Sequence, residues 1–431
     1  MIARIIELSA RHRFLVVALT LVAVLFAVRA MRDIPLDAIP DLSDTQVIVY
    51  SRWDRSPDLV EDQVTYPIVT ALLGTPRVKA IRGFSDFGYS FVYAVFEDGT
   101  DIYWARSRVL EYLSGIQARL PEGVRTELGP DASGVGWIWQ YALVDRTGTR
   151  DPYELRSFQD WYLEYWLRSV EGVAEVATIG GFEKQYQVTV DPEALVARGI
   201  SITRVIEAVR DGNRETGGRV LEIAGAEFMV RGRGYASSIA DLERIVVAVG
   251  DGGVPVTVGD VARVGIGPEM RRGVGDLDGT GDAVSGIVVM RHGENALHVI
   301  ERVRERVREI TPSLPDGVEI VPVYDRSRLI EEAIDVLEHE LLLAMVIVSL
   351  VILVFLWHLP SAVVPIVTIP VSVLLAFLPM WALGITSNIM SLAGIAISIG
   401  VLVDGAIIEV ENAYNRIHRW HVAGRPASCQ R

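Results

Sequence analysis

One apolar run does most to decide the fold of this chain: Ile395-Ala-Ile-Ser-Ile-Gly-Val-Leu-Val-Asp404-Gly-Ala-Ile-Ile-Glu409-Val-Glu411-Asn412. It belongs to a segment, Ile389 to Val410, that is apolar except for Asp404 and Glu409. About 20 such residues form a helix that crosses the ~30 Å hydrocarbon core of a bilayer. A carboxylate at the centre of that helix costs roughly 2.5 to 3.5 kcal/mol, so ionisable residues there usually have a function. The run therefore predicts a membrane helix with a titrating carboxylate.

Three further apolar runs predict three further membrane helices. Phe14 to Val28 and Leu341 to Trp357 contain no charged residue. Ala362 to Ile385 is apolar but contains three prolines, which a membrane helix tolerates when neighbouring helices pack against it. The predicted spans are residues 14–31, 338–358, 362–385 and 389–413.

The first run also fits a secretory signal, because Arg4, Arg11 and Arg13 precede a short apolar stretch. A small-x-small cleavage motif does not follow it, since Arg29 and Arg32 occupy that region. We therefore expect an uncleaved membrane anchor.

Basic residues set the expected orientation of these spans. Arginines precede the first span at positions 4, 11 and 13 and follow the fourth span at positions 416, 419 and 425. Positive residues mark the cytoplasmic side of a membrane, so residues 1–13 and the tail 414–431 are expected in the cytoplasm. The long segment from about Arg32 to Glu332 then lies on the far side, which is the periplasm for a bacterial inner-membrane protein.

Composition agrees with apolar spans joined to a water-soluble part. Half of the 431 residues are apolar, yet the chain carries 41 Lys and Arg and 55 Asp and Glu. The net charge of −14 argues against nucleic acid as a partner. A single cysteine, Cys429, excludes an internal disulfide and a cysteine-based zinc site. P-loop, HExxH and nucleophile-elbow motifs are absent from the sequence, so neither hydrolysis nor ATP use is indicated.

The segment between the first two spans contains an internal repeat. Leu120-Pro-Glu-Gly-Val124 reappears as Leu314-Pro-Asp-Gly-Val318. Each copy follows an amphipathic stretch predicted to be helical, and each leads into a β-prone run. Strand, helix, Pro/Gly turn and strand, used twice, predict two related α+β subdomains.

The prediction of two related α+β subdomains depends on four segments. Tyr89 to Phe96 and Val284 to Met290 are the strands expected before the two helices, which are Trp104 to Ala118 and Ala296 to Ile310. Between the two units, Val173 to Val264 has strands of its own and a helix near 202–210, which indicates an inserted subdomain.

The carboxylates of the fourth span divide into two groups by helical geometry. Asp404 and Glu411 are seven residues apart, so they share one helix face about 10 Å apart along the axis. Glu409 points about 140° away from Asp404, and we interpret it as marking the cytoplasmic end of the helix. We expect Asp404 to titrate during transport, with Glu411 supporting it. The other spans contain no Lys or Arg at a suitable depth, so a basic partner must come from elsewhere.

Two weaker metal signals receive structural interpretations. Asp276-Leu-Asp-Gly-Thr-Gly281 imitates the start of a calcium loop, but Ile287 replaces the glutamate at position 12, so we expect a hairpin turn. His292 and His298 do not share a helical face, and we expect them at a solvated surface.

Taken together, the chain resembles the resistance-nodulation-division exporters, and within them the copper and silver pumps of the heavy-metal branch. The resemblance runs from Met1 to about Trp420 and covers roughly the first two-fifths of a typical member. Five stretches carry it: Asp33-Ile-Pro-Leu-Asp-Ala-Ile-Pro-Asp-Leu-Ser-Asp44, Phe96-Glu-Asp-Gly-Thr-Asp-Ile-Tyr-Trp-Ala-Arg-Ser-Arg108, Leu128-Gly-Pro-Asp-Ala-Ser-Gly-Val-Gly-Trp137, Ile266-Gly-Pro-Glu-Met-Arg-Arg-Gly273 and Asn388-Ile-Met-Ser-Leu392.

The resemblance implies an α+β membrane protein with four of twelve expected transmembrane helices and periplasmic subdomains that are ferredoxin-like α/β sandwiches. One porter subdomain covers 41–133, a second covers 134–179 and 270–332, and a docking insert covers 180–269. It also implies a homotrimer in the inner membrane that joins a periplasmic adaptor and an outer-membrane channel in a tripartite complex. A resident cofactor is not implied, because the metal ion is the cargo and the proton is the coupling ion.

The resemblance also assigns roles to particular residues. It places Asp404 and Glu411 in the proton relay, and Met390 and Met270 on the path of the metal. Soft thioethers suit Cu(I) and Ag(I). Pumps for zinc, cobalt and cadmium carry an aspartate six residues before the relay aspartate, where Ser398 stands here. Two further methionine positions of the path are Leu402 and Glu409 in this chain.

Several alternatives remain open. The ion could be divalent (zinc, cobalt, cadmium or nickel), or the cargo an amphiphilic drug. Because the tail after Trp420 no longer resembles the family, the chain could also be a truncated, non-transporting remnant or a membrane-anchored periplasmic binding module. A protein-export factor of the same superfamily is a third class, which the matched stretches do not support.

Overall fold

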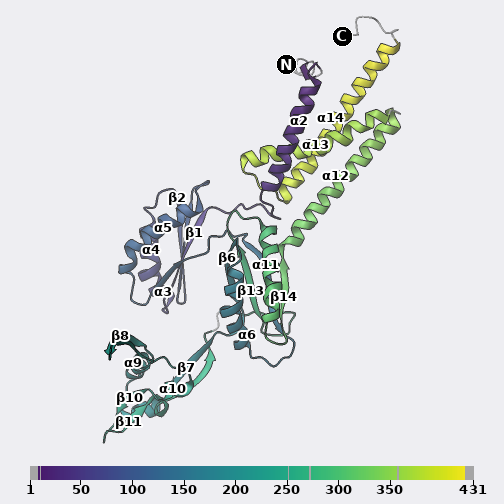
Figure 1. Cartoon of the computed structure of the whole chain (residues 1–431). Helices are drawn as coiled ribbons and strands as arrows, with labels where there is room; N and C mark the ends of the chain where they lie inside the picture. The colour runs from purple at the N-terminus through teal and green to yellow at the C-terminus, as the bar shows by residue number, and fades with distance from the viewer. Residues whose placement is uncertain (1–7, 10, 251, 271–272, 357–358, 423–431) are drawn as a thin grey trace.

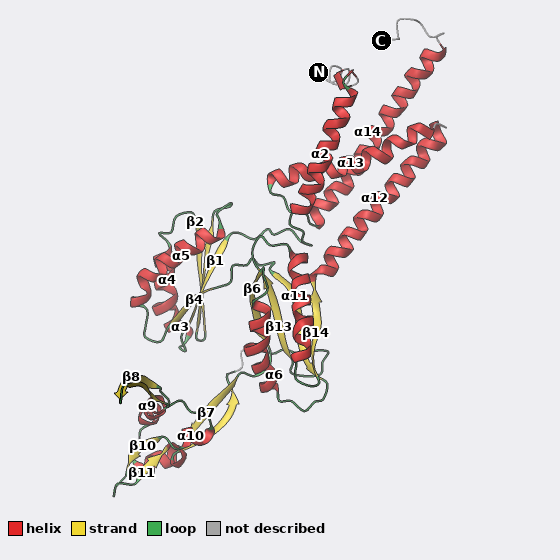
Figure 2. Ribbon diagram, viewed as in Figure 1, coloured by secondary structure: helices red, strands yellow, loops and turns green. Residues whose placement is uncertain are grey.

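The computed structural model describes residues 8–9, 11–250, 252–270, 273–356 and 359–422. Arg4, Arg425 and Cys429, and residues 357–358 of the second predicted span, lie outside the described residues. Four long helices gather at one end of the molecule, and an extended insert lies at the other end (Figures 1 and 2). Two α/β bodies lie between them.

The first body is a four-stranded antiparallel sheet of order β2-β3-β1-β4. Apolar residues of its strands and helices form one buried core, in which Val49, Ile68, Phe96 and Val109 take part. In chain order its elements are β1 (Gln46–Arg52), α3 (Pro57–Val60), η1 (Glu61–Thr65), α4 (Tyr66–Leu72), β2 (Val78–Asp86), β3 (Tyr89–Phe96), α5 (Ile102–Ile116), η2 (Gln117–Arg119) and β4 (Arg125–Leu128).

The second body is a four-stranded sheet of order β14-β5-β13-β6, also antiparallel, around a separate core. Its first half precedes the insert and its second half follows it. The elements are β5 (Trp137–Asp145), α6 (Pro152–Phe158), η3 (Gln159–Leu163), α7 (Glu164–Arg168) and β6 (Val173–Ile179), then β13 (Val284–Met290), α11 (Ala296–Ile310), η5 (Thr311–Ser313) and β14 (Val318–Asp325).

The two bodies share one topology, which confirms the predicted repeat. Each runs strand, helix, strand, strand, helix, strand, and the four strands take the same relative positions in both sheets. In both copies a 3₁₀ turn precedes the repeated motif, whose glycine has a left-handed backbone, with φ of 88° at Gly123 and 78° at Gly317. Glycine adopts this conformation without the steric cost that a side chain would add, so the motif recurs because the same turn recurs.

Helix α11 shows why these sequences form these elements. Asn295 caps its start by accepting a hydrogen bond from the backbone N–H of His298 at 3.2 Å. Its buried residues include Ala296, Val299, Ile300 and Val303, whose spacing places them on one face of the helix. The predicted helix Ala296–Ile310 is confirmed. Helix α5 of the first body begins at Ile102, two residues before the predicted start at Trp104, because Asp101 caps it.

The insert joins the second body through a two-stranded ribbon, β7 (Lys184–Val190) paired with β12 (Ala262–Pro268). A small core of its own holds it together, including Leu195, Val205 and Val258. Its other elements are α8 (Pro192–Arg198), α9 (Ile202–Gly212), β8 (Thr216–Ile223), β9 (Ala226–Gly232), α10 (Ile239–Glu243), β10 (Val246–Val249), β11 (Pro255–Thr257) and η4 (Val258–Asp260).

All four predicted membrane spans are helical. They lie in α2 (Arg13–Asp33), α12 (Arg326–Leu356), α13 (Leu359–Leu383) and α14 (Ile389–Val422), and α13 packs against the other three. By length and composition, Arg13–Asp33 and Ile366–Leu383 are suited to cross a membrane, and Ile389–Leu402 is a shorter apolar helix. Membrane crossing by any of the four helices stays a prediction. Helix α12 begins twelve residues before its predicted span because Ile330 and Ile334 pack on the core of the second body.

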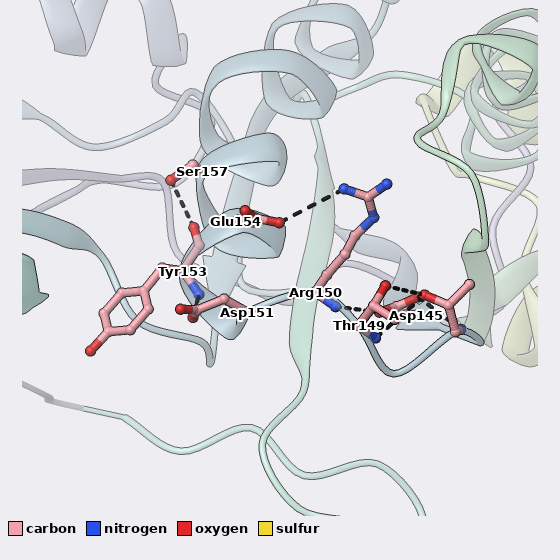
Figure 3. Close-up of polar contacts among 8 residues, drawn as sticks. Asp145, Thr149, Arg150, Asp151, Tyr153, Glu154 and Ser157 are labelled. Carbon is pink, nitrogen blue, oxygen red and sulfur yellow. Dashed lines mark hydrogen bonds and ion pairs between the residues drawn. The ribbon is translucent and has the colours of Figure 1, made fainter.

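The turn between β5 and α6 is held by two aspartates (Figure 3). Asp145 accepts hydrogen bonds from the Thr147 hydroxyl at 2.6 Å and from the backbone N–H of Arg150 at 2.8 Å. These bonds favour the charged carboxylate and lower the pKa of Asp145 to about 2. Asp151 caps α6 by accepting from the backbone N–H of Tyr153 at 2.9 Å. The turn therefore sets where the helix begins.

Gly286 in the centre of β13 provides a test of this packing. A methyl group there would overlap the ring of Tyr141, which is fully buried and donates a hydrogen bond to Gln159 at 2.8 Å. We expect Gly286→Ala to lower the opening free energy of the β5 and β13 amides by about 1–3 kcal/mol in hydrogen exchange. Gly265→Ala in β12 is the matched control, because a methyl group there meets nothing within 4 Å. Equal protection in both variants would contradict the prediction.

Candidate functional site

Helix α14, which carries the predicted relay residues, has a fixed starting point. The Oδ1 atom of Asn388 accepts hydrogen bonds from the backbone N–H groups of Met390 and Ser391, both at 3.0 Å. The Ser391 hydroxyl donates to the carbonyl oxygen of Thr386 at 3.1 Å. Asn388 is itself buried, so the cap belongs to the packed interior. The cap sets the rotation of every residue that follows along the helix.

Asp404 and Glu411 lie on a face of α14 that the chain leaves open. The buried residues Leu392, Ile399 and Val410 share the face that packs against α12 and α13. Asp404 is rotated about 140° from Ile399, and its side chain is exposed, as is that of Glu411. Since both residues are helical, the predicted shared face of Asp404 and Glu411 is confirmed. Their role in proton transfer stays a prediction.

Met390 belongs to the same face. It lies in the first turn of α14, about 40° from Asp404 around the axis, and is exposed. Leu402 and Glu409 are about 160° and 140° from Asp404, so they share a different face. Where an aspartate would stand in a divalent-metal pump, Ser398 donates its hydroxyl to the carbonyl oxygen of Gly394 at 2.8 Å. The structure therefore places one thioether on the helix face of the two carboxylates, about 21 Å along the axis from Asp404, and places the two positions that lack methionine on another face.

The predicted basic partner of Asp404 is not found in this part of the chain. Among the described residues, no ion pair involves Asp404. The open face is accordingly available to another helix.

Met270 lies far from α14, in a cleft between the two α/β bodies. The cleft has a volume of about 350 Å³. Residues of β1 and β3 line it from the first body, and residues of α6, β6 and the two strand-to-insert connections line it from the second. The side chain of Met270 is 77% exposed and also borders an adjoining cavity of about 610 Å³. A soft metal ion could reach this thioether directly from solvent.

An ion pair between Arg52 and Glu269 crosses the cleft beside Met270. Arg52 is the last residue of β1, and Glu269 directly follows β12, so the pair connects the first body to the base of the insert. The ring of Tyr89 lies 6.0 Å from the guanidinium carbon of Arg52. The hydrogen bond to Glu269 raises the pKa of Arg52 above its ordinary value.

Glu183 places a second carboxylate at the same point. Its carbonyl oxygen accepts a hydrogen bond from the backbone N–H of Glu269 at 3.0 Å. A hydrogen bond with the Glu269 carboxylate, together with burial and like-charge repulsion, raises the pKa of Glu183. Two carboxyl groups, one arginine and one thioether thus meet at the mouth of the cleft.

Close backbone packing positions this cluster. Gly180 has a φ of 78°, and a side chain there would overlap the carbonyl oxygen of Ala283. Arg156 donates to the Gly180 carbonyl oxygen at 2.9 Å and to Asp160 at 2.6 Å. The two connections to the insert are therefore held side by side, which brings Glu183 against Glu269.

The two weaker metal signals have the expected structural explanations. Asp276 and Asp282 form an antiparallel bridge around a turn in which Asp278 and Gly279 have positive φ, so the hairpin is confirmed. His292 and His298 are both exposed, as expected. His292 Nδ1 is 3.8 Å from an Asp41 oxygen, and His298 borders an apolar cavity beside α12 and α13. A group of three or more His, Cys, Asp or Glu suited to a metal does not occur among the described residues.

Sequence reasoning missed Arg52, Glu183 and Glu269 as site residues. Arg52 and Glu269 are 217 positions apart, and neither has a local pattern that predicts its partner. The only available signal was the Gly-Pro-Glu-Met stretch, in which Glu269 precedes the methionine already singled out.

The fold defines a class: a protein that joins two related α/β bodies to a group of long helices, two of which are apolar and long enough to cross a membrane. Residues 5–428 match the AcrB/AcrD/AcrF family, and the chain belongs to it. It is 51% identical over 421 residues to the cation efflux system protein SilA of Salmonella typhimurium and 50% identical to the cation efflux system protein CusA of Escherichia coli K12. Each match covers 97% of this chain and 40% of the relative.

More distant relatives and solved structures agree. The cobalt-zinc-cadmium resistance protein CzcA of Cupriavidus metallidurans is 35% identical, with 99% of this chain and 40% of the relative covered. The crystal structure of a heavy metal efflux pump has a TM-score of 0.83 and 34% identity, covering 96% of this chain and 41% of that chain. The chain therefore has the resistance-nodulation-division efflux-pump fold and spans about 40% of the length of these relatives.

The carboxyl pair gives a pH-dependent prediction. The raised pKa of Glu183 means that its protonated form favours the folded state, and this stabilisation is lost as pH rises through that pKa. We expect Glu183→Gln to melt at a higher temperature than the wild-type chain at pH 7.5. The difference should vanish well below about pH 4, where Glu183 is protonated in both the folded and the unfolded state. Thermal unfolding of the full chain at the two pH values measures this, and a difference that does not depend on pH would contradict it.

Proposed function

We propose that this chain forms the N-terminal part of an inner-membrane, proton-driven exporter of Cu(I) and Ag(I). The observation that carries the proposal is the open face of α14, along which Met390, Asp404 and Glu411 are aligned, with Met390 about 21 Å from Asp404 along the axis. A helix that presents carboxylates to a membrane interior suits a proton relay. A thioether on the same face suits a soft monovalent ion.

The cleft between the bodies supplies the entry site in this proposal. Met270 binds the ion from the periplasm, beside the carboxylates of Glu183 and Glu269. The two bodies are ferredoxin-like porter subdomains, since their strand-helix-strand-strand-helix-strand order is that of a split β-α-β unit. The insert is the docking region. Helices α2, α12, α13 and α14 all span the membrane, with residues 1–13 and 414–431 in the cytoplasm.

The proposal includes the partners that the family resemblance implies. The complete protein is a homotrimer that joins a periplasmic adaptor and an outer-membrane channel, and membrane lipid surrounds the four helices. Nucleic acid has no part in it. The protein acts as a secondary transporter and not as an enzyme.

Ion identity is the finer part of the proposal. Identity to SilA and CusA, at about half of the residues, exceeds the 35% identity to CzcA. The serine at position 398, bonded within its own helix, supports the monovalent ion over zinc, cobalt, cadmium or nickel.

The test is a complete transporter in which this chain replaces the matching residues of E. coli CusA, expressed in a strain that lacks CusA. We expect restored tolerance to copper and silver. Assembled protein that restores only zinc, cobalt or cadmium tolerance would identify a divalent-cation exporter. Assembled protein without any metal tolerance would identify a non-transporting remnant.

Asp404→Asn in that transporter should abolish metal tolerance without reducing the amount of trimer, because the amide cannot exchange a proton. Glu409→Gln is the matched control on the same helix, since Glu409 lies about 140° away from Asp404. Trimer is measured by native electrophoresis and tolerance by growth. Tolerance retained with Asp404→Asn would remove this residue from the relay.

Met390→Leu should lower kcat/KM for silver transport by about tenfold, or ~1.4 kcal/mol, because leucine keeps the volume and removes the sulfur. Met380→Leu, a buried methionine of α13, is the control and should leave transport unchanged. Transport is measured as silver uptake in proteoliposomes. Equal values for both variants would make Met390 a packing residue.

A further inference from the structure

Three segments far apart in the sequence meet where α14 begins. They are the extended segment after α2 (residues 35–38), the turn between α13 and α14 (residues 386–389) and Arg326 at the start of α12; we call this meeting point the junction. The backbone N–H of Asp37 donates to Ser387 O, and that of Ser387 donates to Pro35 O, both at 3.0 Å. The N–H of Ile389 donates to Ala38 O at 3.1 Å. The first residue of α14 is thus hydrogen bonded to a distant strand-like segment.

A buried ion pair locks the junction to the second body. Arg326 Nη1 lies 3.3 Å from both carboxylate oxygens of Asp37, and the two side chains are only 6% and 16% exposed. Burial raises the pKa of Asp37 despite the neighbouring arginine. Arg326 Nε is buried without a hydrogen-bond partner among the described residues.

Such a pair is a poor way to gain stability, because desolvation of two charges offsets most of their attraction. What the pair does supply is a defined direction and distance between two segments. Its neighbours Arg304 and Asp325 form a further ion pair at the end of β14, and Arg304 also donates to Ser327 at 2.7 Å. The junction is therefore fixed to the last strand of the second sheet.

The junction packs the start of the relay helix against the second α/β body. Ala38 and Ile330 are buried in the core of the second body. The first body has a separate core and faces the second across the cleft that holds Met270. Asp404 lies roughly 22 Å along α14 from the junction. Movement of α14 along its axis would therefore displace the second body against the first and change the width of the cleft.

We propose that Asp37 and Arg326 are positioning residues that transmit the displacement of α14 to the second body and so couple the relay helix to the metal-binding cleft. The inference rests on the proposed function and adds the mechanical link between its two sites. The pair touches neither the metal nor the transferred proton. It acts by holding the start of α14 at a fixed place on the second body.

The test is the double variant Asp37→Asn/Arg326→Gln in the complete transporter, which leaves no buried charge unpaired. Metal uptake into proteoliposomes is measured over a range of metal concentrations. We expect kcat to fall about tenfold or more while KM stays within about twofold, because the cleft still binds metal but no longer follows α14. Trimer amount and melting temperature should match those of the wild type. The control is Arg146→Gln/Glu319→Gln, which removes an exposed 2.9 Å pair on the same sheet and should leave kcat unchanged.

Two outcomes would overturn the proposal. One is a correctly assembled double variant with wild-type kcat. The other is a variant whose kcat falls only in proportion to the loss of folded trimer, because the pair would then be purely structural. Asp404→Asn, measured in parallel, separates this inference from the proposed function: if Asp404→Asn transports normally, the proposed relay itself fails, whatever the double variant does.

Discussion

The hydrogen bonding of β13 on both of its edges is the constraint on which the rest of the structure depends. This strand pairs with β5 on one side and with β6 on the other, although the whole insert separates it from β6. An antiparallel sheet leaves a central strand little freedom of register when one face is buried. Closing this ladder brings the two ends of the insert together, which in turn places Glu183 against Glu269. On the other edge of β5, strand β14 completes the sheet and is followed directly by α12.

The two α/β bodies have separate hydrophobic cores. Each body buries its own apolar residues, and the contact between the bodies is a polar cleft rather than a shared core. Polar interfaces between domains allow relative motion more readily than large apolar ones do. The Arg52–Glu269 pair connects the bodies at one exposed point. This arrangement favours a cleft whose width can change while each body keeps its internal structure.

At the helical end of the chain, α14 leaves the face that carries Asp404 and Glu411 exposed. The apolar stripe of α14 packs against its neighbours, and the carboxylates lie on the other side. An exposed carboxylate face on a membrane helix is costly unless another element covers it. The family relatives are more than twice the length of this chain, and their further segments supply the obvious place for that element. The carboxylate face of α14 is therefore only one side of the proposed relay site.

The sequence by itself determined the features that depend on short-range physics. The period of the apolar residues identified four long helices, the turn motif with its glycine identified the repeat, and the spacing of Asp404 and Glu411 placed them on one face. Each depends on residues within about two helical turns or one hairpin, so local geometry suffices. The quoted stretches, through family resemblance, also indicated where the insert interrupts the second body.

Only the tertiary structure decided the contacts between distant residues. Arg52 meets Glu269, Asp37 meets Arg326, and Ser387 meets the segment after α2, all across hundreds of positions. Charged side chains are abundant in this sequence, and pairing among them depends on which sheet edges and helix ends the folded chain brings together. Burial of the Asp37–Arg326 pair likewise depends on packing by elements far apart in the chain. For this physical reason the sequence pointed to the relay carboxylates and the methionines, whereas the cleft and the junction emerged only with the fold.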